Sequence, residues 1–138
     1  MNIEETLNDF RNSYLEALQK NGVSRERGEA LVKTLKELVE EEVRSPYQFE
    51  LFHRALRSPF DYYAFGNNFF RPLIKLKESK ILGREQLQKI LEQLSQGENV
   101  VLFANHQVEP DPQVISILLE HEYPELVENM IFVAGSRV

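Results

Sequence analysis

The spacing of apolar residues changes along the chain, and this change constrains the fold more than any other feature. Residues 1–57 repeat apolar side chains at three- and four-residue steps, which is the period of an amphipathic helix. Residues 99–104 are instead nearly continuous in apolar residues and β-branched at their start, which favours a strand buried on both faces. The sequence therefore predicts two regions of different class, 1–57 and 58–138.

The first region predicts a small bundle of three amphipathic helices. The first helix ends at Asn21-Gly22, since both residues accept the left-handed conformation that a helix C-terminus favours. Ser24 can cap the second helix. Ser45-Pro46 starts the third, with serine as the cap and proline at the first helical position. The apolar stripe of the first helix comprises Ile3, Leu7, Phe10, Tyr14, Leu15 and Leu18.

The second region predicts helices at 60–70, 84–95 and 112–120, with apolar strands between and after them. The strands are a loose edge strand at 73–76 and two buried strands at 99–104 and 130–134. A strand, a helix and a second strand over 99–134 make a βαβ unit, whose crossover is right-handed. We therefore expect an α+β or α/β protein, with a helical bundle at 1–57 followed by the beginning of an α/β domain at 58–138.

Composition excludes several classes of function. The chain has no cysteine, which rules out disulfides, thiolate metal sites and cysteine nucleophiles. Its three histidines lie far apart in sequence, so we expect no metal site. A net charge of −6 argues against nucleic-acid binding, which needs a basic face. The longest apolar run is about five residues, against the roughly 20 of a membrane span. We therefore expect no transmembrane segment, and a cytoplasmic or processed organellar protein.

His106 and Asp111 are the residues best suited to catalysis. They lie in a polar turn, 105–112, directly after the predicted strand 99–104, and open α/β sheets bind ligands at the carboxyl ends of their strands. A histidine there can take a proton from an alcohol, and a carboxylate on its other ring nitrogen fixes the tautomer. An aspartate before a proline is also an ordinary helix start. From the residues alone, both interpretations of Asp111 stay open.

The sequence Asn-His-Gln-x-Glu-x-Asp-Pro at 105–112 resembles the first motif of the glycerolipid acyltransferases, whose signature is His-x4-Asp. The variant with Gln107, Glu109 and Pro112 is similar to the soluble, plastid-type glycerol-3-phosphate acyltransferases. Three further segments fit that group in the same order: 58–63, then 65–68 with 71–74, and 131–135 before Arg137-Val138. The chain departs from the usual pattern at Val108, where the family has Thr or Ser, and at Ser136, where it has Asp.

The resemblance implies a reaction and a role for each site residue. An acyl group passes from an acyl-acyl carrier protein or acyl-CoA thioester to the sn-1 hydroxyl of glycerol 3-phosphate, in phospholipid synthesis. His106 is the general base, and Asp111 orients it and balances its charge. Gln107 and Glu109 shape the substrate-binding turn, and Arg137 points toward the phosphate. No metal and no tightly bound cofactor are needed. The location implied is the cytoplasm or the plastid stroma.

Residues 71–89 form a locally basic stretch in an acidic chain, with six basic side chains against two acidic ones. Such a stretch suits contact with an acidic acyl carrier protein or with an anionic membrane surface. A solvated segment of mixed charge is equally consistent with it.

The family's acyltransferase domain continues past the position of Val138 and carries its phosphate-binding residues there. The resemblance therefore implies a fragment, and we expect the 138-residue chain alone to transfer little acyl group. Two alternatives stay open. One is a phosphate-ester hydrolase or another transferase that uses the same His/Asp pair. The other is a helical protein-interaction module at 1–57 beside a non-catalytic α/β remnant.

Overall fold

A computed structural model describes residues 3–48 and 57–133. The chain divides into two compact units, Met1–Leu56 and Arg57–Val138, and each is described by itself. No helix within the described ranges is long and apolar enough to cross a membrane.

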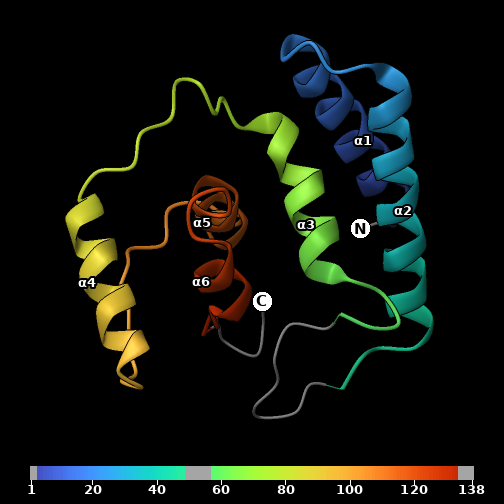
Figure 1. The fold of residues 1–138 in the computed structure, drawn as a ribbon. Coiled ribbons are helices and arrows are strands. Elements are labelled where there is room, and N and C mark those ends of the chain that lie inside the picture. Colours follow the sequence, from blue (N-terminus) through green and yellow to red (C-terminus); the bar gives the residue numbers. More distant parts are fainter. Residues whose placement is uncertain (1–2, 49–56, 134–138) are drawn as a thin grey trace. The chain divides into compact units, whose positions relative to one another are not determined.

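The first unit is built on a hairpin of two helices, α1 (Ile3–Lys20) and α2 (Arg25–Arg44), which lie side by side in Figure 1. Both form where the apolar period predicts them. Gly22, with φ of 74°, lies in the turn, and the Ser24 side chain caps α2 by accepting a hydrogen bond from the Arg27 amide. Tyr14 and Leu18 are buried on α1, and Val32 is buried on α2.

Gly28 lies on α2 where this helix contacts α1. A Cβ atom at this position would lie 2.6 Å from Leu15 Cδ2 and 2.9 Å from Leu18 Cδ1, which is closer than packed carbon atoms approach. The missing side chain therefore makes room for the two leucines of the neighbouring helix. An interior glycine lowers helix propensity, and here that cost accompanies close packing between α1 and α2.

The predicted start of a third helix at Ser45-Pro46 is wrong. Ser45 instead ends α2, donating its backbone N–H to the Glu41 carbonyl, and residues 46–48 are not helical. The remainder of that predicted helix, from residue 49 to 56, lies outside the described residues. Within the described part of this unit, the structure is a two-helix hairpin.

The second unit contains α3 (Tyr62–Phe70), the short 3-10 helix η1 (Arg71–Leu73), α4 (Arg84–Ser95), α5 (Asp111–Leu119) and α6 (Pro124–Asn129). Helix α3 packs on α5, and α5 packs on α6. Their buried apolar side chains are Phe69, Ile117, Leu119 and Val127. Helix α6 was not expected from the sequence, although proline at its first position is a familiar helix start.

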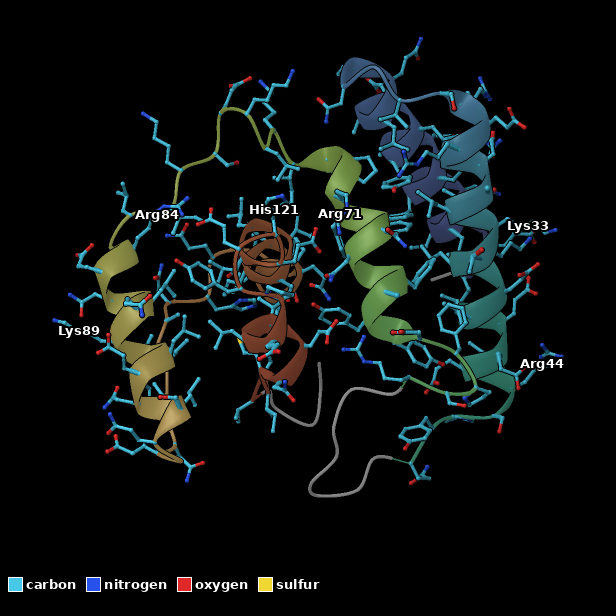
Figure 2. All side chains as sticks on the ribbon, in the orientation of Figure 1. Lys33, Arg44, Arg71, Arg84, Lys89 and His121 are labelled. Carbon is cyan, nitrogen blue, oxygen red and sulfur yellow. The ribbon has the colours of Figure 1, made fainter. Side chains whose placement is uncertain are left out.

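Two ion pairs and one helix cap stabilise the second unit. Arg71, labelled in Figure 2, forms a two-point contact with Glu120 just after α5, with one N–O distance of 2.8 Å. Arg84, at the start of α4, pairs with Glu122. Asp61 caps α3 by accepting a hydrogen bond from the Ala64 amide at 2.9 Å. The two ion pairs therefore join η1 and the start of α4 to the residues that follow α5.

The predicted α/β class and its βαβ unit are wrong for residues 3–48 and 57–133, which contain helices and no strand or sheet. Residues 73–76 form the end of η1 and a turn, and residues 99–104 and 130–133 run without regular structure. Phe103 is 96% exposed and Val133 is 98% exposed. A strand exists only where a neighbour accepts and donates its backbone hydrogen bonds, and neither apolar run has such a neighbour in the described structure.

Candidate active site

The turn that precedes α5 carries the candidate site. The backbone N–H of Asp111 donates to the Val108 carbonyl at 3.0 Å, and the Val114 N–H donates to the Pro110 carbonyl at 2.8 Å. The first bond closes a tight turn over 108–111, and the second begins the helix. Proline at 110 and 112 restricts the backbone on both sides of Asp111. The turn therefore brings the Asp111 side chain back over residues 106–108.

A single carboxylate oxygen of Asp111 receives three contacts. Its Oδ2 lies 3.0 Å from His106 Nδ1, and it accepts hydrogen bonds from the backbone N–H groups of Gln107 at 2.7 Å and Val108 at 3.2 Å. No side-chain hydrogen bond caps the N-terminus of α5. Of the two arrangements open for Asp111, the structure shows the carboxylate folded back onto the loop.

These contacts set the charge of Asp111. The Gln107 N–H lowers the pKa of the Asp111 carboxyl below its usual value, with further lowering by the Val108 N–H and by His106, against a partial opposing effect of desolvation. Asp111 is therefore a carboxylate at neutral pH. The His106 side chain remains 63% exposed, whereas that of Asp111 is 26% exposed. The histidine faces solvent and the aspartate lies behind it.

This geometry suits proton transfer. When Nδ1 of His106 carries the proton and donates it to the carboxylate, Nε2 keeps its lone pair. Nε2 of this largely exposed side chain can then accept a proton from a hydroxyl group, and the carboxylate stabilises the imidazolium that forms. The arrangement has the chemistry of a two-residue general base.

The other predicted site residues are placed differently. The side chains of Gln107 and Glu109 are exposed and make no hydrogen bond or ion pair with residues 3–48 or 57–133. Gln107 takes part through its backbone N–H, as does Val108. Arg137 lies outside the described residues. Reasoning from side-chain chemistry missed the two backbone amides, since every residue except proline has one and no residue type marks them.

The aromatic segment 60–70 supports the helix that carries Asp111. Phe65 packs against Phe60 and Phe69, with ring centroids 5.6 Å apart in both pairs. Phe69 is buried in the core of the unit. Gly66 of α3 lies against Gln113 in the first turn of α5, where a Cβ atom would be 3.4 Å from the glutamine side chain. These contacts fix α3 beside the beginning of α5.

Two further observations concern metal ligands and surface hollows in the described structure. In the part of the chain that the structure describes, no three histidine, aspartate or glutamate side chains are grouped as metal ligands. A surface hollow of about 380 Å³ lies between α3, α5 and α6, lined by residues that include Tyr63, His121 and Val127. His106 and Asp111 are not among its lining residues.

No protein-family model matches the chain. Curated plant proteins do match it. Over 97 residues, or 70% of this chain, it is 46% identical to "Glycerol-3-phosphate acyltransferase, chloroplastic" of Pisum sativum. Over the same length it is 50% identical to "Glycerol-3-phosphate acyltransferase ATS12, chloroplastic" of Cucurbita moschata.

A third match extends over nearly the whole chain. "Glycerol-3-phosphate acyltransferase, chloroplastic" of Phaseolus vulgaris is 36% identical over 140 aligned residues, covering 99% of this chain. The match spans 21% of the pea and squash proteins and 30% of the bean protein. The chain is thus similar to one part of the chloroplastic glycerol-3-phosphate acyltransferases of plants.

Proposed function

We propose that this chain supplies the catalytic base of a glycerol-3-phosphate 1-O-acyltransferase. The observation that carries the proposal is the contact between His106 Nδ1 and Asp111 Oδ2 at 3.0 Å, with the exposed histidine in front of the carboxylate. The similarity to plant proteins of that name supports the choice of reaction. In the His-x4-Asp pattern, His106 acts on the substrate and Asp111 acts through His106.

The proposed reaction needs one proton acceptor and no covalent enzyme intermediate. Nε2 of His106 removes the proton from the sn-1 hydroxyl of glycerol 3-phosphate as the oxygen attacks the thioester carbonyl of the acyl donor. A C–O ester bond forms and the C–S bond breaks. The thiolate leaves and recovers a proton from the imidazolium, giving 1-acyl-glycerol 3-phosphate and a free thiol. Asp111 holds the Nδ1 proton and stabilises the imidazolium between these steps.

The remaining roles follow from the same proposal. The donor is an acyl-acyl carrier protein or an acyl-CoA, and the reaction serves phospholipid synthesis without a metal or a bound cofactor. Arg137 contacts the substrate phosphate, and the side chains of Gln107 and Glu109 line the approach to the turn. The word "chloroplastic" in the names of the relatives supports the plastid stroma over the cytoplasm.

The test places the chain in the setting of a whole enzyme. The 138 residues replace the matching segment of the Phaseolus vulgaris protein, and thiol release from an acyl-CoA and an acyl-acyl carrier protein is followed with and without glycerol 3-phosphate. We expect release that requires glycerol 3-phosphate. His106→Ala should lower kcat by about 10²–10⁴-fold, which is the usual contribution of a general base.

Two controls make the result specific. His121→Ala removes another exposed histidine, which lies outside the candidate site, and should leave kcat unchanged. Circular dichroism of each variant confirms that the protein is folded. Thiol release that does not need glycerol 3-phosphate would indicate a hydrolase. Full activity of a folded His106→Ala protein would contradict the role of His106.

A further inference from the structure

The loop between η1 and α4 presents aliphatic and basic side chains together. Residues 74–83 connect the two elements without regular helix, as Figure 1 shows. Leu82 is 87% exposed and Leu76 is 45% exposed. The exposed lysines of the same loop are Lys75, Lys77 and Lys80. We call these five residues the loop patch.

The positive charge of the loop patch is mostly unneutralised. Its one acidic neighbour in the loop is Glu78, which lies 3.6 Å from Lys75 with both side chains largely exposed. Lys77 and Lys80 form no ion pair with residues 3–48 or 57–133. Three lysines and one glutamate give the loop a net charge of +2, in a chain whose total is −6.

The flanking charged residues do not change this balance. Arg71 and Arg84, on either side of the loop, are paired with Glu120 and Glu122. Glu85 and Lys89, both exposed on α4, offset one another. The loop is therefore positively charged, whereas the chain as a whole is negative and would be repelled by an anionic surface.

We propose that the loop patch docks the protein on an anionic lipid membrane. Lysines close to such a surface are attracted by acidic headgroups, and each strengthens binding by about fivefold. Leu76 and Leu82 lose exposed apolar area when they enter the interface, while the lysine side chains keep their ammonium groups among the headgroups. This contact needs only projecting side chains, so a bilayer fits the loop better than a shaped protein partner does.

Another exposed apolar run of this unit, residues 100–103, does not fit the same partner. Residues 100–103 carry Val101 and Phe103 on the surface, yet no lysine or arginine occurs between 96 and 111. The charged neighbours there are Glu98, Glu109 and Asp111, which an anionic surface repels. Charge therefore favours the loop patch over residues 100–103 as the membrane contact. This inference does not depend on acyl transfer.

The absence of tryptophan from the chain allows a direct test. Leu82→Trp places a single tryptophan in the loop patch, and Phe103→Trp places one within residues 100–103. Each protein is titrated with vesicles of phosphatidylcholine alone and of phosphatidylcholine and phosphatidylserine in equal amounts. We expect a blue shift at position 82 with the anionic vesicles only, and none at position 103. The shift should disappear in about 1 M salt, where the Debye length falls to about 3 Å.

Charge-matched variants test the lysines. Substitution of Lys75, Lys77 and Lys80 by Gln should weaken co-sedimentation with the anionic vesicles by about a hundredfold, at about fivefold per lysine. Substitution of Lys20, Lys33 and Lys36 by Gln removes the same charge from α1 and α2 and should leave binding unchanged; Lys33 is labelled in Figure 2.

Three results would overturn the proposal. The first is equal binding by the two triple variants, and the second is a blue shift at position 103 but not at position 82. The third is binding of the loop patch to acyl carrier protein with no binding to either kind of vesicle. The last result would assign the patch to an acidic protein partner.

Discussion

Two substitutions of Asp111 separate its charge from its effect on the turn. Its Oδ2 accepts the backbone N–H groups of Gln107 and Val108 and contacts His106 Nδ1. Asp111→Asn keeps an oxygen that can accept the two backbone hydrogen bonds but removes the negative charge. Asp111→Ala removes the acceptor altogether, so both N–H groups lose this partner. We expect the turn to persist in the first variant and to loosen in the second.

The size of the effect on catalysis follows from the position of Asp111 behind His106. If Asp111 acts through the histidine, as we propose, its removal cannot cost more than loss of the general base, about 10²–10⁴-fold in kcat. We expect Asp111→Asn to lower kcat by about 10²-fold and Asp111→Ala to approach the His106→Ala value. Residues that act as a unit are not additive. The double variant His106→Ala/Asp111→Asn should therefore be no slower than His106→Ala.

The assay measures kcat and KM separately in the chimera with the bean enzyme. A carboxylate that orients the base should change kcat and leave KM for glycerol 3-phosphate nearly unchanged. Asp9→Asn is the matched control, because Asp9 is exposed on α1 and loses the same charge. In the 138-residue chain, amide exchange at Gln107 and Val108 reports whether the turn is kept.

Near wild-type kcat in folded Asp111→Asn would refute the role of the carboxylate charge. A double variant whose loss equals the product of the single losses would refute action through His106. Slow amide exchange at Gln107 and Val108 in Asp111→Ala would show that the carboxylate does not hold the turn.

Three further predictions follow from named contacts. The lowered pKa of Asp111 means that its contribution to the turn is complete above the ordinary value of 3.8 and is lost as pH falls through the lower folded value, so the carboxyl carbon resonance of Asp111 itself should keep its ionised value down to about pH 4 and move to the protonated value only below that. Burial raises the pKa of the Tyr14 phenol to about 12, so its contribution to the hairpin is complete below pH 10 and is lost as pH rises toward 12. The phenolate absorbance of Tyr14, taken as the difference between the wild type and Tyr14→Phe because the chain has four other tyrosines, should appear only in that range, and a midpoint near 10 in this difference would contradict the burial. Leu18 is 1% exposed, and Leu18→Ala should lower the free energy of unfolding by about 2–5 kcal/mol in urea denaturation, whereas a loss below about 1 kcal/mol would show that the site is loosely packed.

Local signals in the sequence predicted several of the helices, although the predicted start at Ser45-Pro46 is wrong and α6 was missed. The helix expected at 84–95 is α4, Arg84–Ser95, and the helix expected at 112–120 is α5, Asp111–Leu119. Ser24 caps α2 as its position before an apolar period indicates. These features depend on residues three or four apart, and the helix supplies its own backbone hydrogen bonds. Neighbouring residues are therefore enough to indicate them.

The strand predictions were wrong because a strand, unlike a helix, depends on residues far away in the sequence. An apolar run at 99–104 shows only that the segment avoids polar residues, and its hydrogen bonds must come from a distant segment. The described structure provides no such neighbour, so the run stays irregular with Phe103 exposed. Gly28 shows that contacts between helices are likewise not evident from local sequence. Only the packed hairpin shows that Leu15 and Leu18 occupy the space where a side chain at position 28 would lie.

The candidate site combines both kinds of information. The sequence by itself determined that a histidine and an aspartate lie five positions apart, beside prolines that restrict the turn between them. Only the folded chain decided that Asp111 turns back to His106 and to the amides of Gln107 and Val108 instead of capping α5. The carboxylate of an aspartate can accept hydrogen bonds from N–H groups that precede it in the chain or from those that follow it. Its choice depends on which N–H groups the surrounding turn brings within about 3 Å, and that distance is a property of the structure.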